Sequence, residues 1–169
     1  MANTFFAEGS TGPGRLTLSN GATDVFFDVL TLAGCAIAET PWQRHLALFC
    51  ADGHRLDRGC AGFDLGELPW TPDWPAEKSF FLRLIDMAAT RHGWDLLRYE
   101  PPYASNYLAA YRRMVDGYRP VPAESSEAGD WREPPAPELL ERCDTHHIYQ
   151  GQFGCRLCDP ELQPEPSTR

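Results

Sequence analysis

The longest apolar stretch of this chain lies within Thr23-Asp-Val-Phe-Phe-Asp-Val-Leu-Thr-Leu-Ala-Gly-Cys-Ala-Ile37. Its apolar residues recur at the three- and four-residue spacing of one helix face. Thr23 or Asp24 can cap the first turn, and Thr40-Pro41 stops the helix. The stretch is interrupted by Asp28 and is shorter than the roughly 20 apolar residues that cross a bilayer. It therefore predicts a buried helix and no membrane span.

The segments on either side of this helix predict a small sheet and a second helix. Within residues 1–20, Thr4–Phe6 and Arg15–Leu18 flank a glycine-rich turn and so predict a β-hairpin. After Thr40-Pro41, the apolar residues between Trp42 and Cys50 share one helical face. The alternation of residues 46–49 before Asp52-Gly53 leaves a strand and hairpin turn as the competing prediction.

The chain between Pro75 and Tyr118 predicts two further helices and a strand. Pro75 stands near the start of an apolar helical stripe that ends at His92-Gly93. Ser105 can cap the last long helix, over Asn106–Asp116. Between these helices, Trp94–Tyr99 predicts a strand. Residues 59–76 are too aromatic for a mere connector, so we expect them to pack on the body.

These elements predict an α+β fold in which a mainly helical body occupies residues 1–118. Its small antiparallel sheet combines the hairpin with Trp94–Tyr99. Residues 119–137 are rich in Pro, Glu, Ser and Ala, and this composition predicts a linker. A cysteine-rich knuckle follows over residues 138–160, and residues 161–169 predict a frayed tail.

The strongest chemical motif of the chain is the knuckle sequence Cys143-Asp-Thr-His146-His147-Ile-Tyr-Gln-Gly-Gln-Phe-Gly-Cys155-Arg-Leu-Cys158. A CxxH pair is followed by a CxxC pair, and each pair lets a tight turn direct two side chains at one ion. Residues 148–153 can form a short hairpin between the pairs. We expect Cys143, His146, Cys155 and Cys158 to bind Zn²⁺. His147 is the alternative to His146.

This motif resembles the zinc-ribbon and treble-clef families over about 16 of the 169 residues. The resemblance implies a fold and a metal rather than an activity. Four protein ligands leave no open coordination position, so we expect the ion to be structural. From Glu138 to Arg169 the chain holds six acidic residues against three arginines, a balance that disfavours DNA or RNA as a ligand.

A second candidate site is the acidic and aromatic segment from Phe63 to Glu77, which contains no basic residue. Aromatic anchors with complementary charge around them are typical of tight protein interfaces. The alternative is that both tryptophans cover the core while the acids face water. The candidate partner-binding residues are Asp64, Glu67, Trp70, Asp73 and Trp74.

The order of segments over roughly residues 24–100 resembles small acidic immunity proteins of bacterial toxin systems. The resemblance rests on an Ala-rich helix, the Trp42-Gln43 helix, Gly62-Phe-Asp-Leu-Gly-Glu-Leu-Pro-Trp70 and Lys78-Ser-Phe-Phe-Leu-Arg-Leu-Ile-Asp-Met-Ala88. Such proteins occlude a basic toxin and perform no chemistry. The resemblance therefore implies a non-enzymatic inhibitor that binds a basic protein.

Composition narrows the classes of function. The formal net charge of −9 argues against a surface that neutralises phosphates. The first residues lack the basic region and long apolar core of a signal peptide, so we expect a cytoplasmic protein. Six cysteines in such a chain are expected to be reduced or metal-bound, because the cytosol keeps thiols reduced.

Two alternatives to an inhibitor stay open. One is a zinc-ribbon adaptor or regulator that recruits a larger protein machine through its tail. The other is a small enzyme that uses the region of Cys50 and His54, where a thiol and an imidazole lie close in sequence. The oligomeric state and the identity of any partner or substrate do not follow from the sequence.

Overall fold

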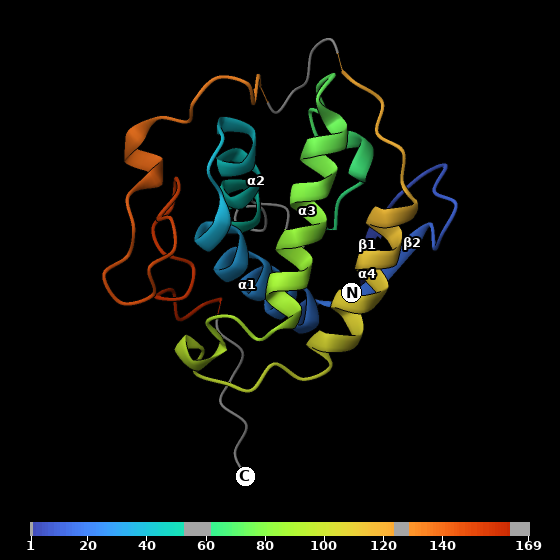
Figure 1. Cartoon of the computed structure of the whole chain (residues 1–169). Coiled ribbons are helices and arrows are strands. Elements are labelled where there is room, and N and C mark those ends of the chain that lie inside the picture. The colour runs from blue at the N-terminus through green and yellow to red at the C-terminus, as the bar shows by residue number, and fades with distance from the viewer. Residues whose placement is uncertain (1, 53–61, 124–128, 163–169) are drawn as a thin grey trace.

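The computed structural model describes residues 2–52, 62–123 and 129–162. Over these residues the chain forms four α-helices, a two-stranded antiparallel sheet and three short 3-10 turns, which confirms the α+β class. Figure 1 shows α3 (Trp74–Ala89) beside α4 (Ala104–Gly117), with α1 (Asn20–Ile37) and α2 (Pro41–Asp52) behind and to the left. The helix α1 contacts each of the other three.

The predicted hairpin is confirmed and leads straight into α1. The strand β1 (Ala2–Phe6) pairs with β2 (Arg15–Ser19), and Thr4 lies opposite Thr17. Ser19 caps α1 through its side chain, which accepts a hydrogen bond from the backbone of Ala22. The prediction of a cap at Thr23 or Asp24 was wrong, because no loop separates the strand from the helix.

The helices α2 and α3 confirm two further predictions. At the start of α2, the Thr40 hydroxyl accepts from the Gln43 backbone, and the Gln43 side chain accepts from the Thr40 backbone. This reciprocal capping fixes a helix where a strand was the alternative. The helix α3 buries the predicted apolar stripe, and it ends at Ala89, three residues before His92.

Two predicted features around α4 were wrong. Residues 94–99 form no strand: a 3-10 turn, η2 (Trp94–Leu96), follows Gly93, whose φ is +74°. The backbone N–H groups of Leu96 and Leu97 donate to the carbonyls three residues earlier, at Gly93 and Trp94, rather than to another strand. The helix α4 begins at Ala104, directly after the left-handed residue Tyr103, so Ser105 lies inside its first turn and does not cap it.

The core has an aromatic centre and an aromatic edge. Phe5 of the hairpin packs within 5.1 to 5.8 Å, ring centre to ring centre, of Phe26, Phe27, Phe63 and Tyr111. At the edge, Trp42 packs between Trp70 and Trp131.

Part of the predicted linker also packs on the body. Trp131 is 4% exposed and stacks on His45, whose Nε2 lies 2.9 Å from the Glu133 carbonyl. The division of the chain into separate domains stays a prediction.

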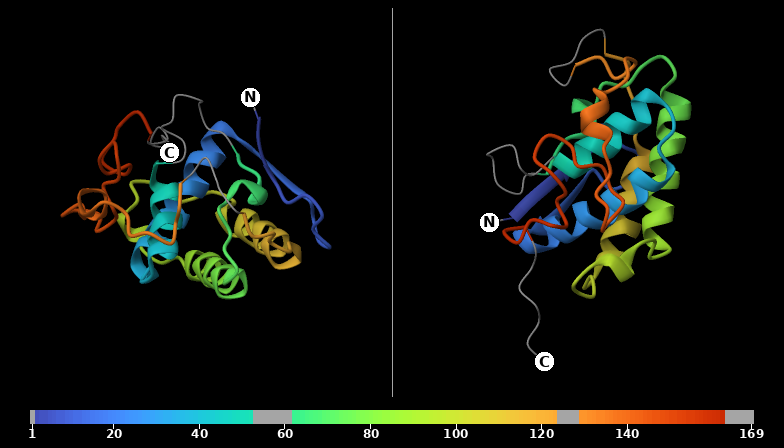
Figure 2. Two further views of the ribbon diagram at one scale, coloured as in Figure 1. Left: turned by 90° about the horizontal axis from the view of Figure 1, so that it is seen from above. Right: turned by 90° about the vertical axis from the view of Figure 1, so that its left-hand side faces the viewer.

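The C-terminal knuckle lies against α1 and α2. Its first residues form a 3-10 turn, η3 (Pro137–Leu140), and its apolar side chains join a second core cluster with Leu32, Cys35 and Leu48. Figure 2 shows the knuckle and the hairpin at opposite ends of the molecule. The remaining short turn, η1 (Leu65–Glu67), precedes α3.

Gly34 of α1 packs tightly against both α2 and α3. A Cβ atom at this position would lie 3.0 Å from Leu84 Cδ1 of α3 and 3.3 Å from Ala47 Cβ of α2. We expect Gly34→Val to lower the free energy of unfolding by about 1–3 kcal/mol through overpacking, as measured by urea denaturation. Gly21→Val is the matched control, because nothing lies within 4 Å of its Cβ position in the same helix. Equal effects of the two substitutions would contradict the packing argument.

Candidate metal centre

The four predicted ligands come together at one point of the knuckle. The ligand atoms of Cys143, His146, Cys155 and Cys158 all lie within 4.8 Å of one another. The His146 Nδ1 atom is 3.6, 3.5 and 3.4 Å from the sulfurs of Cys143, Cys155 and Cys158, respectively. The Cys143 and Cys158 sulfurs are 3.6 Å apart, well beyond the roughly 2.05 Å of a disulfide. This cluster could hold a metal ion.

The structure decides between the two adjacent histidines. His146 is 6% exposed and turns its Nδ1 toward the three sulfurs, whereas His147 is exposed and has a left-handed backbone with φ of +58°. Burial, aided by the positive charge of Arg98, lowers the pKa of His146. A neutral imidazole is the form that binds metals.

Tight turns aim backbone N–H groups at the sulfurs. Burial opposes ionisation of the Cys143 thiol, but hydrogen bonds from the backbones of His146 and Thr145, together with those from the side chains of Cys155 and Cys158, outweigh it and leave its pKa below the ordinary value. The second pair closes its own turn, in which the Cys158 N–H donates to the Cys155 carbonyl. Arg142, just before the first pair, and Tyr149, between the pairs, form an isolated antiparallel bridge. Residues 151–154 are turns, so the predicted hairpin over 148–153 was wrong in its extent.

Arg156, between the two cysteines of the second pair, anchors the knuckle in the body. Its side chain and that of Asp28 in α1 are both fully buried, and the Arg156 Nε atom donates to Asp28 Oδ1 at 2.6 Å. Its Nη1 atom donates to the carbonyls of Cys50 and Ala51 in the last turn of α2. The hydroxyl of Tyr99 donates to the other oxygen of Asp28. One guanidinium thus joins the knuckle, α1 and α2.

Two further contacts hold the knuckle in place. Arg142 donates to the carbonyl of Cys35 in the last turn of α1, at 2.7 Å. The carboxylate of Asp52, at the end of α2, accepts from the backbone N–H of Gln152 at 3.1 Å. Gly151 allows this approach: its φ is +59°, and a Cβ there would lie 2.3 Å from the Asp52 carboxylate.

The structure separates the candidate partner-binding residues into exposed acids and packed tryptophans. Glu67 and Asp73 are exposed, and Asp64 is half-buried. Trp70 is 1% exposed and donates its indole N–H to the Leu65 carbonyl, so it is a core residue. Trp74, the first residue of α3, is half-buried against the core.

The thiol that the sequence offers for chemistry, Cys50, is enclosed. Cys50 is fully buried, and burial raises its pKa to about 12, so it carries its proton at neutral pH. A protonated thiol is a poor nucleophile. Cys35 is also buried, and its sulfur accepts from the Tyr149 backbone. His54 and Cys60 lie outside the described residues.

The sequence did not predict the buried ion pair between Arg156 and Asp28. Both left a signal: a lone acid interrupts an otherwise apolar helix, and a buried charge of this kind needs a partner. The arginine stands between Cys155 and Cys158, two members of the cluster. Neither signal identifies the other residue, because 128 positions separate them.

Comparison with known proteins adds no relative: no family model, curated protein or solved structure matches this chain. The resemblances to zinc ribbons and to immunity proteins therefore rest on the residues quoted for them. Among the described residues, no helix has the length and apolar character needed to cross a membrane.

The burial of the Asp28–Arg156 pair predicts how much stability is lost when the arginine is removed. We expect Arg156→Met to lower the free energy of unfolding by about 3–5 kcal/mol, because it leaves Asp28 charged and buried without its partner. Adding Asp28→Asn removes that charge and should recover part of the loss. Urea denaturation at neutral pH measures both effects.

Arg132→Met is the matched control, since it removes an arginine from an exposed ion pair with Asp130. We expect it to leave the stability unchanged within error. The argument fails if the double variant is as unstable as the sum of its two single substitutions.

Proposed function

We propose that the knuckle binds one zinc ion. Zinc lies about 2.3 Å from thiolate sulfur and about 2.0–2.1 Å from imidazole nitrogen. A tetrahedron with these bonds has edges of about 3.8 Å between two sulfurs and about 3.6 Å between nitrogen and sulfur. The distances of 3.4–3.6 Å from His146 Nδ1 and of 3.6 Å between the sulfurs of Cys143 and Cys158 support this ion.

The ion that we propose has a structural role. Three cysteines and one histidine complete a tetrahedral shell and leave no position for a substrate. When bound, zinc holds Cys155 and Cys158 in one turn and so fixes the backbone of Arg156 between them. The metal thereby stabilises the contact between the knuckle and α1.

Elemental analysis of the purified chain tests this proposal. We expect one zinc per chain in the wild type and none in Cys155→Ser, because the loss of one thiolate opens the shell. His147→Ala should keep its zinc, since this histidine is exposed and is not a member of the cluster. A wild-type protein without zinc after purification free of chelators would contradict the proposal, and so would zinc loss in His147→Ala alone.

We propose further that the chain is a non-enzymatic protein that binds and occludes a basic protein, in the manner of an immunity or inhibitor protein. The observation that carries this proposal is the acidic face, which we define as Asp64, Glu67 and Asp73. The sequence from Phe63 to Glu77 supplies no positive charge to neutralise it. The next residue, Lys78, donates to the Asp116 carbonyl of α4.

Electrostatics explains how such a face would select its partner. A surface of one sign speeds encounter with a partner of the opposite sign and suppresses wrong partners. The net charge of −9 acts in the same direction over the whole molecule. The enclosed thiols of Cys35 and Cys50 and the closed metal shell support a role without chemistry.

One observation favours the adaptor alternative. Phe153, in the turn between the two ligand pairs, is 48% exposed and offers an apolar contact at the tip of the knuckle. Removing the whole tail is a poor test of this alternative, because it also leaves Asp28 without Arg156. Phe153→Ser tests it without disturbing the body: an adaptor would lose its partner, whereas an inhibitor that uses the acidic face would not.

Charge reversal tests the acidic face. A photo-crosslinking residue at position 73 captures a partner, and the complex is then rebuilt from purified proteins. We expect Glu67→Lys combined with Asp73→Lys to weaken this complex at least about tenfold. Raising the salt concentration should weaken the wild-type complex as well. Asp64 is left intact because its side chain accepts from Gly66 at 2.9 Å, the shorter of the two hydrogen bonds that cap η1; Glu67 accepts the longer one, from the Asp64 backbone at 3.3 Å.

The control for net charge is Glu100→Lys combined with Glu138→Lys, two exposed acids outside the acidic face. This variant should bind like the wild type. Equal weakening by both variants would mean that only the total charge matters, and no weakening by either would exclude the acidic face. If the partner is an enzyme, its activity should fall in proportion to complex formation.

A further inference from the structure

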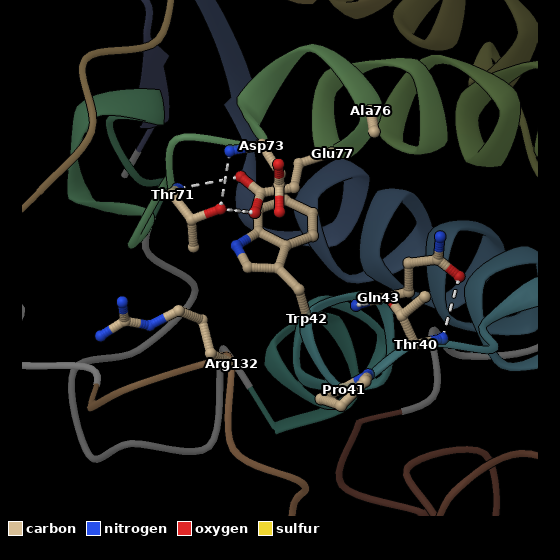
Figure 3. Close-up of a pocket in the computed structure, with 9 residues that line it drawn as sticks. All are labelled: Thr40, Pro41, Trp42, Gln43, Thr71, Asp73, Ala76, Glu77 and Arg132. Carbon is tan, nitrogen blue, oxygen red and sulfur yellow. Dashed lines mark hydrogen bonds between the residues drawn. The ribbon is translucent and has the colours of Figure 1, made fainter.

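A pocket opens beside the acidic face, between the starts of α2 and α3. Its volume is about 340 Å³, which is enough for one long side chain. Figure 3 shows Pro41 and Trp42 of α2 on one side and Glu77 of α3 with Thr71 on the other. Apolar atoms of Pro41, Trp42 and Ala76 thus face the same space as two carboxylates, those of Asp73 and Glu77.

Glu77 is the chemically distinctive group of this pocket. Its side chain is largely buried, at 8% exposure, and it accepts hydrogen bonds from the backbone N–H and the hydroxyl of Thr71. A carboxylate has about four lone-pair positions, so two stay open to a further donor. Neither Glu77 nor Asp73 has an ion-pair partner within residues 2–52, 62–123 and 129–162.

The positive groups near the pocket are already engaged. The guanidinium of Arg132 donates twice to Asp130, each time at 2.8 Å, and points away from Glu77 in Figure 3. At the positive end of α2, the Thr40 hydroxyl accepts from the Gln43 backbone. The carboxylates of Asp73 and Glu77 would therefore repel an anion that entered the pocket and would attract a cation.

We propose that this pocket receives a lysine or arginine side chain of the partner protein. The aliphatic stem would lie against Pro41, Trp42 and Ala76, and the cationic head would contact Glu77 and Asp73. Long basic side chains commonly bury their stems while their charged heads find polar partners. This inference rests on the proposed function in one respect, namely that the partner is a basic protein.

The test uses small amides as probes of the zinc-loaded, full-length chain. The probes are the N-acetyl methylamides of lysine, norleucine and glutamate, which share a backbone and differ in charge. Binding is followed by NMR at the indole N–H of Trp42, which donates to the Pro69 carbonyl and is assigned with Trp42→Phe. We expect saturable binding of the lysine amide, with a Kd on the order of 1 mM for a ligand of this size.

Two variants connect this binding to the carboxylates. Glu77→Gln keeps the shape of the side chain and should weaken the lysine amide about tenfold, because it removes a hydrogen-bonded charge. Asp73→Asn should weaken it less, since this residue is exposed. Glu138→Gln, at an exposed site on η3, is the matched control and should have no effect. If Glu77→Gln fails to fold, Asp73→Asn and the comparison of the three probes decide the question.

Several results would overturn the proposal. Norleucine amide binding as tightly as lysine amide would show an apolar pocket without charge selection. Tighter binding of glutamate amide would show an anion site, and no saturable shift with lysine amide would show no site at all. The rebuilt partner complex separates this inference from the proposed function. If Glu77→Gln leaves that complex intact while reversal of Glu67 and Asp73 breaks it, the pocket proposal fails and the function stands.

Discussion

The buried pair of Asp28 and Arg156 is the contact on which the arrangement of this protein depends. A charge enclosed in a helical core is tolerated only when a partner and hydrogen bonds replace water. Arg156 meets this need from the far end of the chain, and Tyr99 supplies the second hydrogen bond to Asp28. The knuckle is therefore part of the body's electrostatics rather than an appendage, although its composition alone describes a small metal-binding tail.

Two arginines of the knuckle also donate hydrogen bonds to carbonyls at the ends of α1 and α2. The last carbonyls of a helix lack partners within the helix and carry partial negative charge. Neither α1 nor α2 has a basic residue in its last turn. Arg142 and Arg156 of the knuckle supply the missing donors, to Cys35 in α1 and to Cys50 and Ala51 in α2. Each arginine thereby couples the position of the knuckle to the end of a helix.

Local patterns were sufficient to predict the hairpin, the helices and the cluster of Cys143, His146, Cys155 and Cys158, because each is encoded within a few turns or one short motif. For α2, the sequence left a strand open as the alternative. The predicted element boundaries that were wrong depend on contacts with residues distant in the sequence. Residues 94–99 have the composition of a strand, but Trp94 and Tyr99 turn toward the core and toward Asp28. The acidic and aromatic segment was ambiguous for the same reason, since only tertiary packing shows that Trp70 lies inside while Glu67 and Asp73 lie outside.

The distance in sequence between Asp28 and Arg156 has a consequence for biosynthesis. During translation α1 leaves the ribosome long before Arg156 is made, since 128 positions separate the two residues. Until then the Asp28 carboxylate lacks the guanidinium of Arg156 and favours water over a closed core. Completion of the core therefore awaits the synthesis of Arg156. In a nascent chain that stops short of Arg156, the cost of burying the Asp28 carboxylate without this guanidinium opposes closure of the core.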